Sequence, residues 1–568
     1  MQDLSVPKKW ILPKVQDLDP INQILVNRGI IGKEAQQRFL HPDFDRDFLD
    51  PFLIKDMEKA ARRILKAIAN NEKIGIFGDY DADGIPATAL LIRGLSLLKF
   101  QNIYPIIPTR AAGYGLNNDV VDELINNNCQ LLVTIDNGIA AKESIKYALG
   151  NKIETIVVDH HLIQPDFKPD ALAIINPKQD NCMYPEKNLS ACGLVFKLLW
   201  AIFVRLDKST AQLKWLLDLV GISTIADLVP LLGENRLLAY YGLIVLQKTR
   251  NLGLAELYKS ANINPELIDA YTVGFIIAPR LNAPSRMGRE KTLADHPNMI
   301  LDLLTTCDQE RAKQLSEIIA EVNTTRQEIL EKIVKEASLK AKKLVEAGRL
   351  VIVLYDEKWP EGVVGLVASR LVEQFHRPAF VLGGKGETIV GSARSIKNFH
   401  LVDSLAVANK LLLRFGGHAL AAGLSLEKKN LEKFSQKIEN RASQILSDVD
   451  FVKIINIDSQ INIKEIEVSL AQKIQKLAPF GMGNPQPIFL LDGRVDNIRL
   501  MGTEKQHLSF VLRSTNHEVK VVAFSNAKLA DHLQKVANIE LIGNIKINRW
   551  QDKETAQLMF LDYRERSN

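Results

Sequence analysis

Cysteine is scarce in this chain of 568 residues, and long apolar runs are absent. The four cysteines show no C-x-x-C spacing, which disfavours a zinc ribbon and a disulfide framework. No continuous apolar run reaches the ~18 residues that a membrane-spanning helix needs, and the N-terminal segment lacks the apolar core of a signal peptide. The sequence therefore predicts a cytoplasmic protein with no membrane partner.

An excess of charge of one sign is also missing. Lysine and arginine number 72 against 67 aspartates and glutamates, and the net charge of +5 permits a polyanionic partner without arguing for one. Hydrophobic residues make up 46% of the chain, which is enough for several cores. The length predicts about three or four domains.

Apolar runs alternate with helical patterns from residue 51 to about residue 300, which is typical of a parallel sheet covered by helices. These runs are KIGIF, NIYPIIP, LLVTI and ETIVV. The segment from Asp308 to Glu346 has no glycine or proline and predicts a long helix, for which one break was left open. A second α/β unit follows, and the short runs at the C-terminal end favour a small antiparallel barrel or sandwich.

We therefore predict an α/β protein with five segments. They are an N-terminal arm at 1–50, a first α/β domain at 51–306, a connecting helix at 307–346, a second α/β domain at 347–448 and a small β domain at 449–568. The composition of the arm indicates no role for it.

Acidic and imidazole side chains follow three of the predicted strands. They are Asp79, Asp81 and Asp83 in GDYDADG, Asp136 in TIDNG, and His160 and His161 after Asp159 in DHH. Alternate residues of an extended chain point the same way, and the carboxyl ends of neighbouring parallel strands meet at one edge of a sheet. Asp227 lies in the apolar segment IADLVPL, where burial alone would cost several kcal/mol. We expect these side chains to form one site.

Oxygen ligands with one or two histidines fit Mn²⁺ or Mg²⁺ better than structural zinc. Two such ions suit in-line attack on phosphorus, so the pattern predicts phosphoryl-ester hydrolysis. Arginine is the natural clamp for a phosphate, and glycine-rich segments add backbone donors. The candidates are Arg110, Arg280, Arg286 and Arg394, with Ser392 in GSARS and His418 in GGH.

Each motif also has a structural interpretation. The DADG segment is compatible with an acidic surface turn, Asp136 with a turn former before Asn-Gly, and Asp227 with a helix cap. The two histidines could be a hydrogen-bonded core pair, the arginines a surface salt-bridge network, and GGH a tight turn. The shared placement after apolar runs favours the metal centre.

Motif order adds a family resemblance. DYDADG, TIDNG, DHH and IADLVPL resemble the four motifs of the DHH phosphoesterase superfamily, and APRLNAPSRMG, GVVGLVASRL, GSARS and FGGHALAAGL resemble its RecJ branch of single-strand-specific 5′→3′ exonucleases. The resemblance covers residues from about 50 to 568 and implies a DHH domain, a DHHA1-type domain and an OB-like domain. Pro284 and Ser285 depart from the small residues expected there, which bears on substrate fit.

The resemblance implies a role for each matched residue. Asp81 would bind one metal ion, Asp83, His160 and Asp227 the other, and Asp136 both. Asp79 would support the ligands, and His161 would face the scissile phosphate. Arg280, Ser392 and Arg394 would hold the 5′-terminal phosphate, with Arg110, Arg370 and His418 on neighbouring phosphates. The implied cofactors are two Mn²⁺ or Mg²⁺ ions.

The leading hypothesis is a metal-dependent exonuclease that degrades single-stranded DNA to 5′-mononucleotides in recombination and repair, with a helicase and a single-strand-binding protein as partners. Further candidates for DNA contact are Asn282, Arg286, Lys546, Arg549 and Trp550, although a solvated polar face with the tryptophan in the small core is the alternative. Other functions remain open: a DHH phosphoesterase for short oligonucleotides or cyclic dinucleotides, and a DNA-binding scaffold. A Rossmann enzyme is disfavoured, because DYDADG replaces G-x-G-x-x-G after the first strand.

Overall fold

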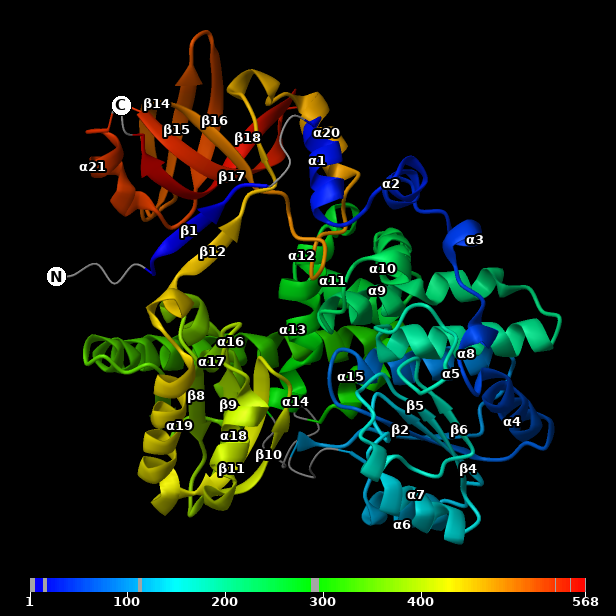
Figure 1. Cartoon of the computed structure of the whole chain (residues 1–568). Helices are drawn as coiled ribbons and strands as arrows, with labels where there is room; N and C mark the ends of the chain where they lie inside the picture. The colour runs from blue at the N-terminus through cyan, green and yellow to red at the C-terminus, as the bar shows by residue number, and fades with distance from the viewer. Residues whose placement is uncertain are drawn as a thin grey trace. The chain divides into compact units, whose positions relative to one another are not determined.

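The chain folds into two compact units (Figure 1). The computed structural model describes residues 6–13, 18–110, 115–287, 296–536, 538–551 and 553–566. The first unit consists of Met1–Pro7, Leu49–Val229 and Tyr241–Lys453, and the second of Lys8–Phe48, Pro230–Tyr240 and Ile454–Asn568. No helix in the described ranges is both long and apolar enough to cross a membrane.

The first unit contains the predicted parallel sheet, with strand order β3-β2-β4-β5-β6. Its strands are β2 (Ile74–Gly78), β3 (Ile103–Ile106), β4 (Leu131–Ile135), β5 (Glu154–Val158) and β6 (Ala173–Ile175). β2 and β4 are buried along their whole length, as expected for a parallel sheet with both faces covered. Because β2, β4 and β5 are neighbours, the three acidic strand ends lie at the same edge of the sheet.

Helices cover this sheet on both faces (Figure 1). They are α4 (Met57–Ala69), α5 (Gly84–Leu97), α6 (Asn118–Asn126), α7 (Lys142–Gly150) and α8 (Ala191–Arg205). Helices α6 and α7 bury apolar side chains against Phe77, Leu132 and Val157 of the sheet. Helix α5 begins directly after the acidic motif, so the end of β2 and the start of α5 fix where the aspartates lie.

A helical segment leads from the first sheet to the second. It contains α9 (Leu217–Ala226), α10 (Gly233–Leu246), α11 (Leu252–Ser260), α12 (Ala270–Thr272), the π-helical turn η6 (Val273–Ile277), α13 (Ala278–Leu281), α14 (Ala283–Met287) and α15 (Asn298–Thr305). The predicted long helix is α16 (Gln309–Glu346), capped by the Asp308 carboxylate on the N–H groups of Glu310 and Arg311. It is continuous, so the break that the sequence left open is not there.

The second sheet has strand order β10-β11-β9-β8-β7. Its strands are β7 (Ile352–Tyr355), β8 (Ala379–Gly383), β9 (Thr388–Arg394), β10 (Leu412–Gly417) and β11 (Ala421–Glu427), with helices α17 (Glu361–Phe375), α18 (Leu401–Val407) and α19 (Leu431–Ile445). Helix α17 packs closely over β9, since a Cβ on Gly365 would lie 3.0 Å from the Ser392 hydroxyl. This second α/β domain confirms the predicted fold class.

The second unit contains a closed five-stranded barrel. Its strands are β14 (Phe489–Met501), β15 (His507–Ser514), β16 (His517–Ala523), β17 (Asn538–Trp550) and β18 (Lys553–Glu565), with the short strand β13 (Ser459–Gln460) beside β14 and helices α20 (Val468–Gln475) and α21 (Ala530–Leu533). The barrel closes because β14 pairs with β17 and β16 pairs in parallel with β18. The C-terminal domain is thus a barrel and not a sandwich.

The N-terminal segment belongs to the same unit as the barrel. It forms β1 (Lys8–Ile11), which pairs with β12 (Lys453–Asn456), and helices α1 (Pro20–Asn27), α2 (Lys33–Leu40) and α3 (Phe44–Asp47). Ile24, Leu25 and Phe39 share one apolar core with the barrel residues Phe489 and Phe510. Residues 18–40 are therefore part of the barrel's packing, and the predicted boundaries at residues 50, 306, 346 and 448 stay predictions.

Candidate metal centre and phosphate site

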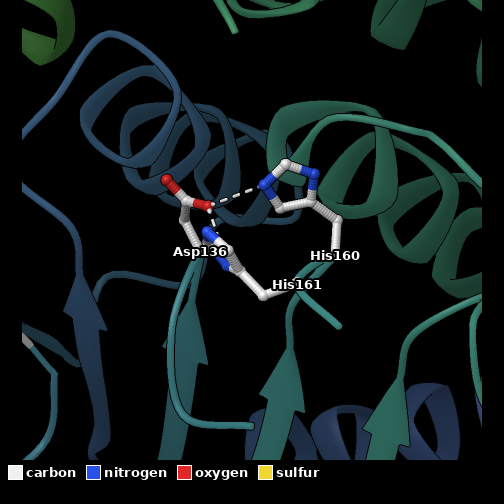
Figure 2. A group of neighbouring side chains, drawn as sticks. All are labelled: Asp136, His160 and His161. Carbon is white, nitrogen blue, oxygen red and sulfur yellow. Dashed lines mark ion pairs between the residues drawn. The ribbon is translucent and has the colours of Figure 1, made fainter. Parts of the chain in front are cut away.

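Carboxylates and imidazoles converge where β2, β4 and β5 end. Figure 2 shows both imidazoles directed toward the carboxylate of Asp136. The Nε2 atom of His160 lies 3.2 Å from Asp136 Oδ1, and the Nδ1 atom of His161 lies 3.9 Å from the same oxygen. The histidines are therefore part of a polar cluster and not a pair enclosed in the apolar core.

Three groups of ligand atoms within this cluster are close enough to hold a metal ion, with all atoms of a group within 4.8 Å of one another. The groups are Asp136 with His160 and His161, Asp83 with His160 and Asp227, and Asp79 with Asp81 and Asp136. Every residue that the sequence predicted as a metal ligand belongs to at least one group. Since Asp136 and His160 each belong to two, the arrangement suits adjacent ions that share ligands.

Asp136 is held in an unusual backbone conformation. Its φ angle is +62°, in the left-handed region, which costs about 1–2 kcal/mol for a residue with a side chain. The next residue stabilises this turn, because the amide of Asn137 donates to the carbonyl oxygens of Ile135 (2.8 Å) and Phe77 (3.4 Å). Gly138 follows at φ +100°, where a Cβ would lie 2.3 Å from the Thr134 hydroxyl. The sequence TIDNG is thus required to direct this carboxylate.

Backbone N–H groups hold two other carboxylates of the cluster. Asp81 Oδ1 accepts from the N–H groups of Asp83 (2.9 Å) and Gly84 (3.0 Å). Asp83 accepts from the first two N–H groups of α8, at 2.8 and 3.0 Å, and from the Ser223 hydroxyl at 2.5 Å. The start of α8, which carries a partial positive charge, thus holds the Asp83 carboxyl group in place.

The other carboxylates are costly to ionise without a cation. Burial, followed by the charge of Asp83, raises the pKa of Asp136 well above its usual range. Burial and Asp83 also raise the pKa of Asp227 to about 8, and burial and Asp81 raise the pKa of Asp79 to about 7. A divalent cation would favour the ionised form of all three, and these oxygen and nitrogen donors match the preferences of Mn²⁺ and Mg²⁺. The residues present therefore fit the predicted metal ions.

The two histidines differ in their protonation. Burial lowers the pKa of His160, which favours the neutral imidazole that a metal ligand needs. Burial acts in the same direction on His161, but a 2.8 Å hydrogen bond with the Asp159 carboxylate and its charge outweigh burial, so the pKa of His161 is raised. The buried Asp159 also accepts from the backbone N–H of Ile139 at 3.0 Å. His161 is thus oriented and favoured as a proton carrier.

Four arginines form a second cluster in the first unit. They are Arg280, Arg286, Arg326 and Arg394, and burial is the main cause that lowers the pKa of each, to about 10 for Arg286. Within the described parts of the chain, none of the four forms an ion pair with a carboxylate. The Nη1 atom of Arg394 donates to the Ser392 hydroxyl at 3.0 Å. Partly buried guanidinium groups without an acidic partner are suited to bind an anion such as phosphate.

Arg326 was not predicted from the sequence. It lies in the middle of α16, is 7% exposed, and donates to the Asn323 side-chain oxygen at 2.9 Å. Its Nε atom, the Nε atom of Arg280 and the Oδ1 atom of Asn282 are buried without a hydrogen-bond partner among the described residues. The predicted residues Arg280 and Asn282 thus have free polar atoms beside a charged residue from the connecting helix.

The remaining predicted phosphate contacts fall into two groups. The guanidinium of Arg110 lies 4.6 Å from the centre of the Tyr80 ring, beside the acidic motif. Burial, then the charge of His161, lowers the pKa of His418, which places this histidine of the second sheet within electrostatic reach of the first. The structure does not bring Arg370 to the cluster: it is exposed on α17 and pairs with Glu373 at 3.1 Å. Its predicted role therefore has no support from the geometry.

The candidate DNA contacts of the barrel lie on β17. Lys546 and Arg549 are exposed, and Arg549 forms an ion pair with Glu554 at 2.8 Å. Trp550 is 71% exposed, so it is not part of the barrel core, and the alternative interpretation of this tryptophan is wrong.

Family models match all three domains. The DHH family N-terminal domain matches residues 73–224, the DHHA1 domain matches residues 348–444, and the RecJ OB domain matches residues 457–562. The single-stranded-DNA-specific exonuclease RecJ of Bacillus subtilis is 37% identical over 95% of this chain and 67% of its own length. The relative of the same name from Haemophilus influenzae is 32% identical over 96% of this chain and 98% of its own. The crystal structure of RecJ in complex with Mn²⁺ from Thermus thermophilus superposes with a TM-score of 0.81 at 29% identity, covering 99% of this chain and 80% of that one.

The parallel sheet carries the DHH motifs and three overlapping groups of possible metal ligands at the ends of its strands. This combination defines a metal-dependent phosphodiesterase of the DHH class. With relatives of this identity over nearly its whole length, the chain belongs to the RecJ family of single-stranded-DNA-specific exonucleases.

Proposed function

We propose that this chain hydrolyses single-stranded DNA from its 5′ end to 5′-mononucleotides, in DNA recombination and repair. The observation that carries the proposal is the cluster of three overlapping groups of ligand atoms at the strand ends, together with four arginines that form no ion pair in the described structure. Metal ligands supply the hydrolytic chemistry and arginines the anion site, and both are needed for a phosphodiester substrate. The alternative, a phosphoesterase for short oligonucleotides or cyclic dinucleotides, leaves the barrel without a role.

The metal-ligand roles follow the sequence prediction. Asp81 would hold one ion, Asp83, His160 and Asp227 the other, and Asp136 would bridge them, with Asp79 in support. When bound, the ions supply activation of water and neutralise the charge on the phosphate. His161, oriented by Asp159, would donate a hydrogen bond to the scissile phosphate or a proton to the leaving oxygen.

The substrate contacts divide by position along the strand. Arg280, Ser392 and Arg394 would hold the 5′-terminal phosphate, and Arg110 and His418 the neighbouring phosphates. The predicted contact of Arg370 has no support from its exposed position on α17. Asn282, Arg286, Lys546, Arg549 and Trp550 would contact the rest of the strand. A fixed distance from the terminal phosphate to the metal ligands would make each cut release one nucleotide.

Partners and location extend this proposal. A helicase would supply unwound strand and a single-strand-binding protein would cover it, both in the cytoplasm. The proposal keeps the predicted domains, at residues 1–50, 51–306, 307–346, 347–448 and 449–568.

The proposal is tested by hydrolysis of a 5′-phosphorylated, 3′-labelled single strand in Mn²⁺. We expect stepwise shortening from the 5′ end with release of mononucleotides, no activity on a matched blunt duplex, and no activity of Asp136→Ala. Equal inertness of wild type and Asp136→Ala, with both still binding the strand, would favour a DNA-binding scaffold. Cleavage restricted to dinucleotides would favour the small-substrate alternative.

A further inference from the structure

The loop that follows β6 holds the backbone of both histidines. β6 is the edge strand beside β5, with Ile175 paired to Val158, so its end lies next to the DHH segment. The amide of Asn176 donates to the carbonyl oxygen of His161 at 3.0 Å. The ammonium group of Lys178 donates to the carbonyl oxygen of His160. Two consecutive peptide carbonyls are therefore bound by side chains of one short loop.

The loop itself is tightly bonded. Asn176 is fully buried, and its side-chain oxygen accepts the backbone N–H of Lys178 at 2.8 Å. Pro177, between them, restricts the backbone, and its carbonyl oxygen accepts from Lys187 at 3.0 Å. One amide thus connects the two contacts, because Asn176 binds His161 with its NH₂ group and Lys178 with its oxygen.

The direction of an imidazole depends on the peptide that carries it. His160 belongs to two of the three groups of ligand atoms, and a ligand geometry must be held to within about 0.5 Å to be productive. Groups that orient a metal ligand from outside typically change metal affinity or activity by about 10–100-fold when removed. In this site Asn176 and Lys178 contact the backbone carbonyl oxygens of the two histidines and not their ring atoms.

We propose that Asn176 and Lys178 are positioning residues of the metal centre, which fix the peptide groups of His160 and His161 and so the directions of the two imidazoles. This inference rests on the proposed function. It assigns to the end of β6 a part in the reaction beside the ends of β2, β4 and β5.

The test compares Lys178→Met, which keeps the length of the side chain without its donor, with Lys178→Arg, which keeps a donor. Mn²⁺ binding is measured by calorimetry, and nucleotide release is measured against Mn²⁺ and DNA concentration. We expect Lys178→Met to weaken Mn²⁺ binding and raise the half-activating Mn²⁺ concentration by about 10–100-fold, with KM for DNA changed less than about twofold, and Lys178→Arg to recover most of the loss. Asn176→Asp, which replaces the donor to His161 by an acceptor, should lower kcat to a similar extent.

Lys187→Met is the matched control, because Lys187 also donates to backbone carbonyls of this loop, those of Pro177 and Cys182, but not to a histidine. Equal weakening of Mn²⁺ binding by Lys187→Met would mean that loop stability is the cause and would overturn the proposal. Unchanged Mn²⁺ binding by Lys178→Met, with a raised KM for DNA that low salt relieves, would show that Lys178 contacts the substrate instead. If Asn176→Asp does not fold, the Lys178 variants still test the proposal, because Lys178 is only half-buried. If the wild type binds Mn²⁺ but does not cleave DNA, the proposed function is refuted. The Mn²⁺ affinities of the variants would still test the positioning role.

Discussion

Replacement of Asp227 by asparagine should stabilise the metal-free protein at alkaline pH. The pKa of this carboxyl is about 8 because of burial and then the charge of Asp83, against an ordinary value of 3.8. Since the folded state binds this proton more tightly than the unfolded chain, the contribution of Asp227 to stability is complete below about pH 4 and is lost as the pH rises through 8. An asparagine has the same shape and no charge, so Asp227→Asn should avoid the loss.

The magnitude follows from the two pKa values. A rise of about 4 units corresponds to about 6 kcal/mol once the group is ionised in both states. The side chain is 29% exposed, and neighbouring carboxylates can take up a proton in its place. We therefore expect Asp227→Asn to gain roughly 2–3 kcal/mol at pH 9 and much less at pH 5, which is a rise in melting temperature of about 5 °C.

Scanning calorimetry in a chelator at pH 5 and pH 9, and then with excess Mn²⁺, measures the effect. Mn²⁺ at about 100 times its Kd should stabilise the wild type by about 2.7 kcal/mol and the Asp227→Asn variant far less, so the metal should cancel or reverse the advantage of the variant. Asp218→Asn is the control for the metal response alone: burial also raises the pKa of this carboxyl, but it lies outside the groups of ligand atoms and accepts from the Thr249 hydroxyl, so this variant should respond to Mn²⁺ as the wild type does. A destabilised Asp227→Asn at both pH values, with a full response to Mn²⁺, would refute the reasoning.

Three further predictions concern the substrate. A Cβ on Gly416 or Gly423 would meet no atom within 4 Å, so Gly416→Ala and Gly423→Ala should keep the wild-type melting temperature. A rise in the KM for DNA by about 10-fold in these variants would show that the substrate lies on β10 and β11, and an unchanged KM would show that it binds elsewhere. Arg394→Lys replaces a guanidinium that bonds Ser392 and should lower the preference for a 5′-phosphate over a 5′-hydroxyl by about 10-fold in paired cleavage assays, while equal loss on both ends would exclude a 5′-phosphate contact. The pKa of His161 is raised, so its protonated form persists to higher pH. At saturating Mn²⁺ the rate of cleavage should therefore fall as the pH rises through that pKa. The His161→Gln variant should be slower, and its rate should not show this fall with pH.

The ends of the strands could be predicted from the sequence because two local features coincide there: an apolar run ends and a polar residue follows it. Apolar runs such as LLVTI and ETIVV correspond to β4 and β5 residue for residue, and each is followed by a polar group that a buried strand cannot hold. Parallel neighbours bring such ends together, so proximity of Asp136 to His160 follows from topology alone. The same signal is present at β6, where Asn176 follows the run AII, but a neutral side chain does not by itself indicate a metal centre.

Other features depend on contacts that no local pattern reveals. Arg326 is one of many charged residues in a 38-residue helix, and only its burial separates it from the exposed ones. Ile24 and Leu25 belong to a core most of whose other members lie more than 400 residues further along the chain. Their periodicity predicts a helix with an apolar face, but the surface that this face covers is a property of the folded unit.

The five aspartates of the metal centre divide into two kinds, and this division explains how they can lie together at one buried edge of the first sheet. Asp81 and Asp83 are held by N–H groups at the start of α5 and α8, which donate to their carboxylate oxygens. Asp79, Asp136 and Asp227 have raised pKa values because burial and the first pair act on them. Asp79, Asp136 and Asp227 can each hold a proton until a divalent cation binds, which limits repulsion between the carboxylates of the cluster. Metal binding should therefore release protons, and more of them near pH 7 than at pH 9, where fewer protons remain to be displaced.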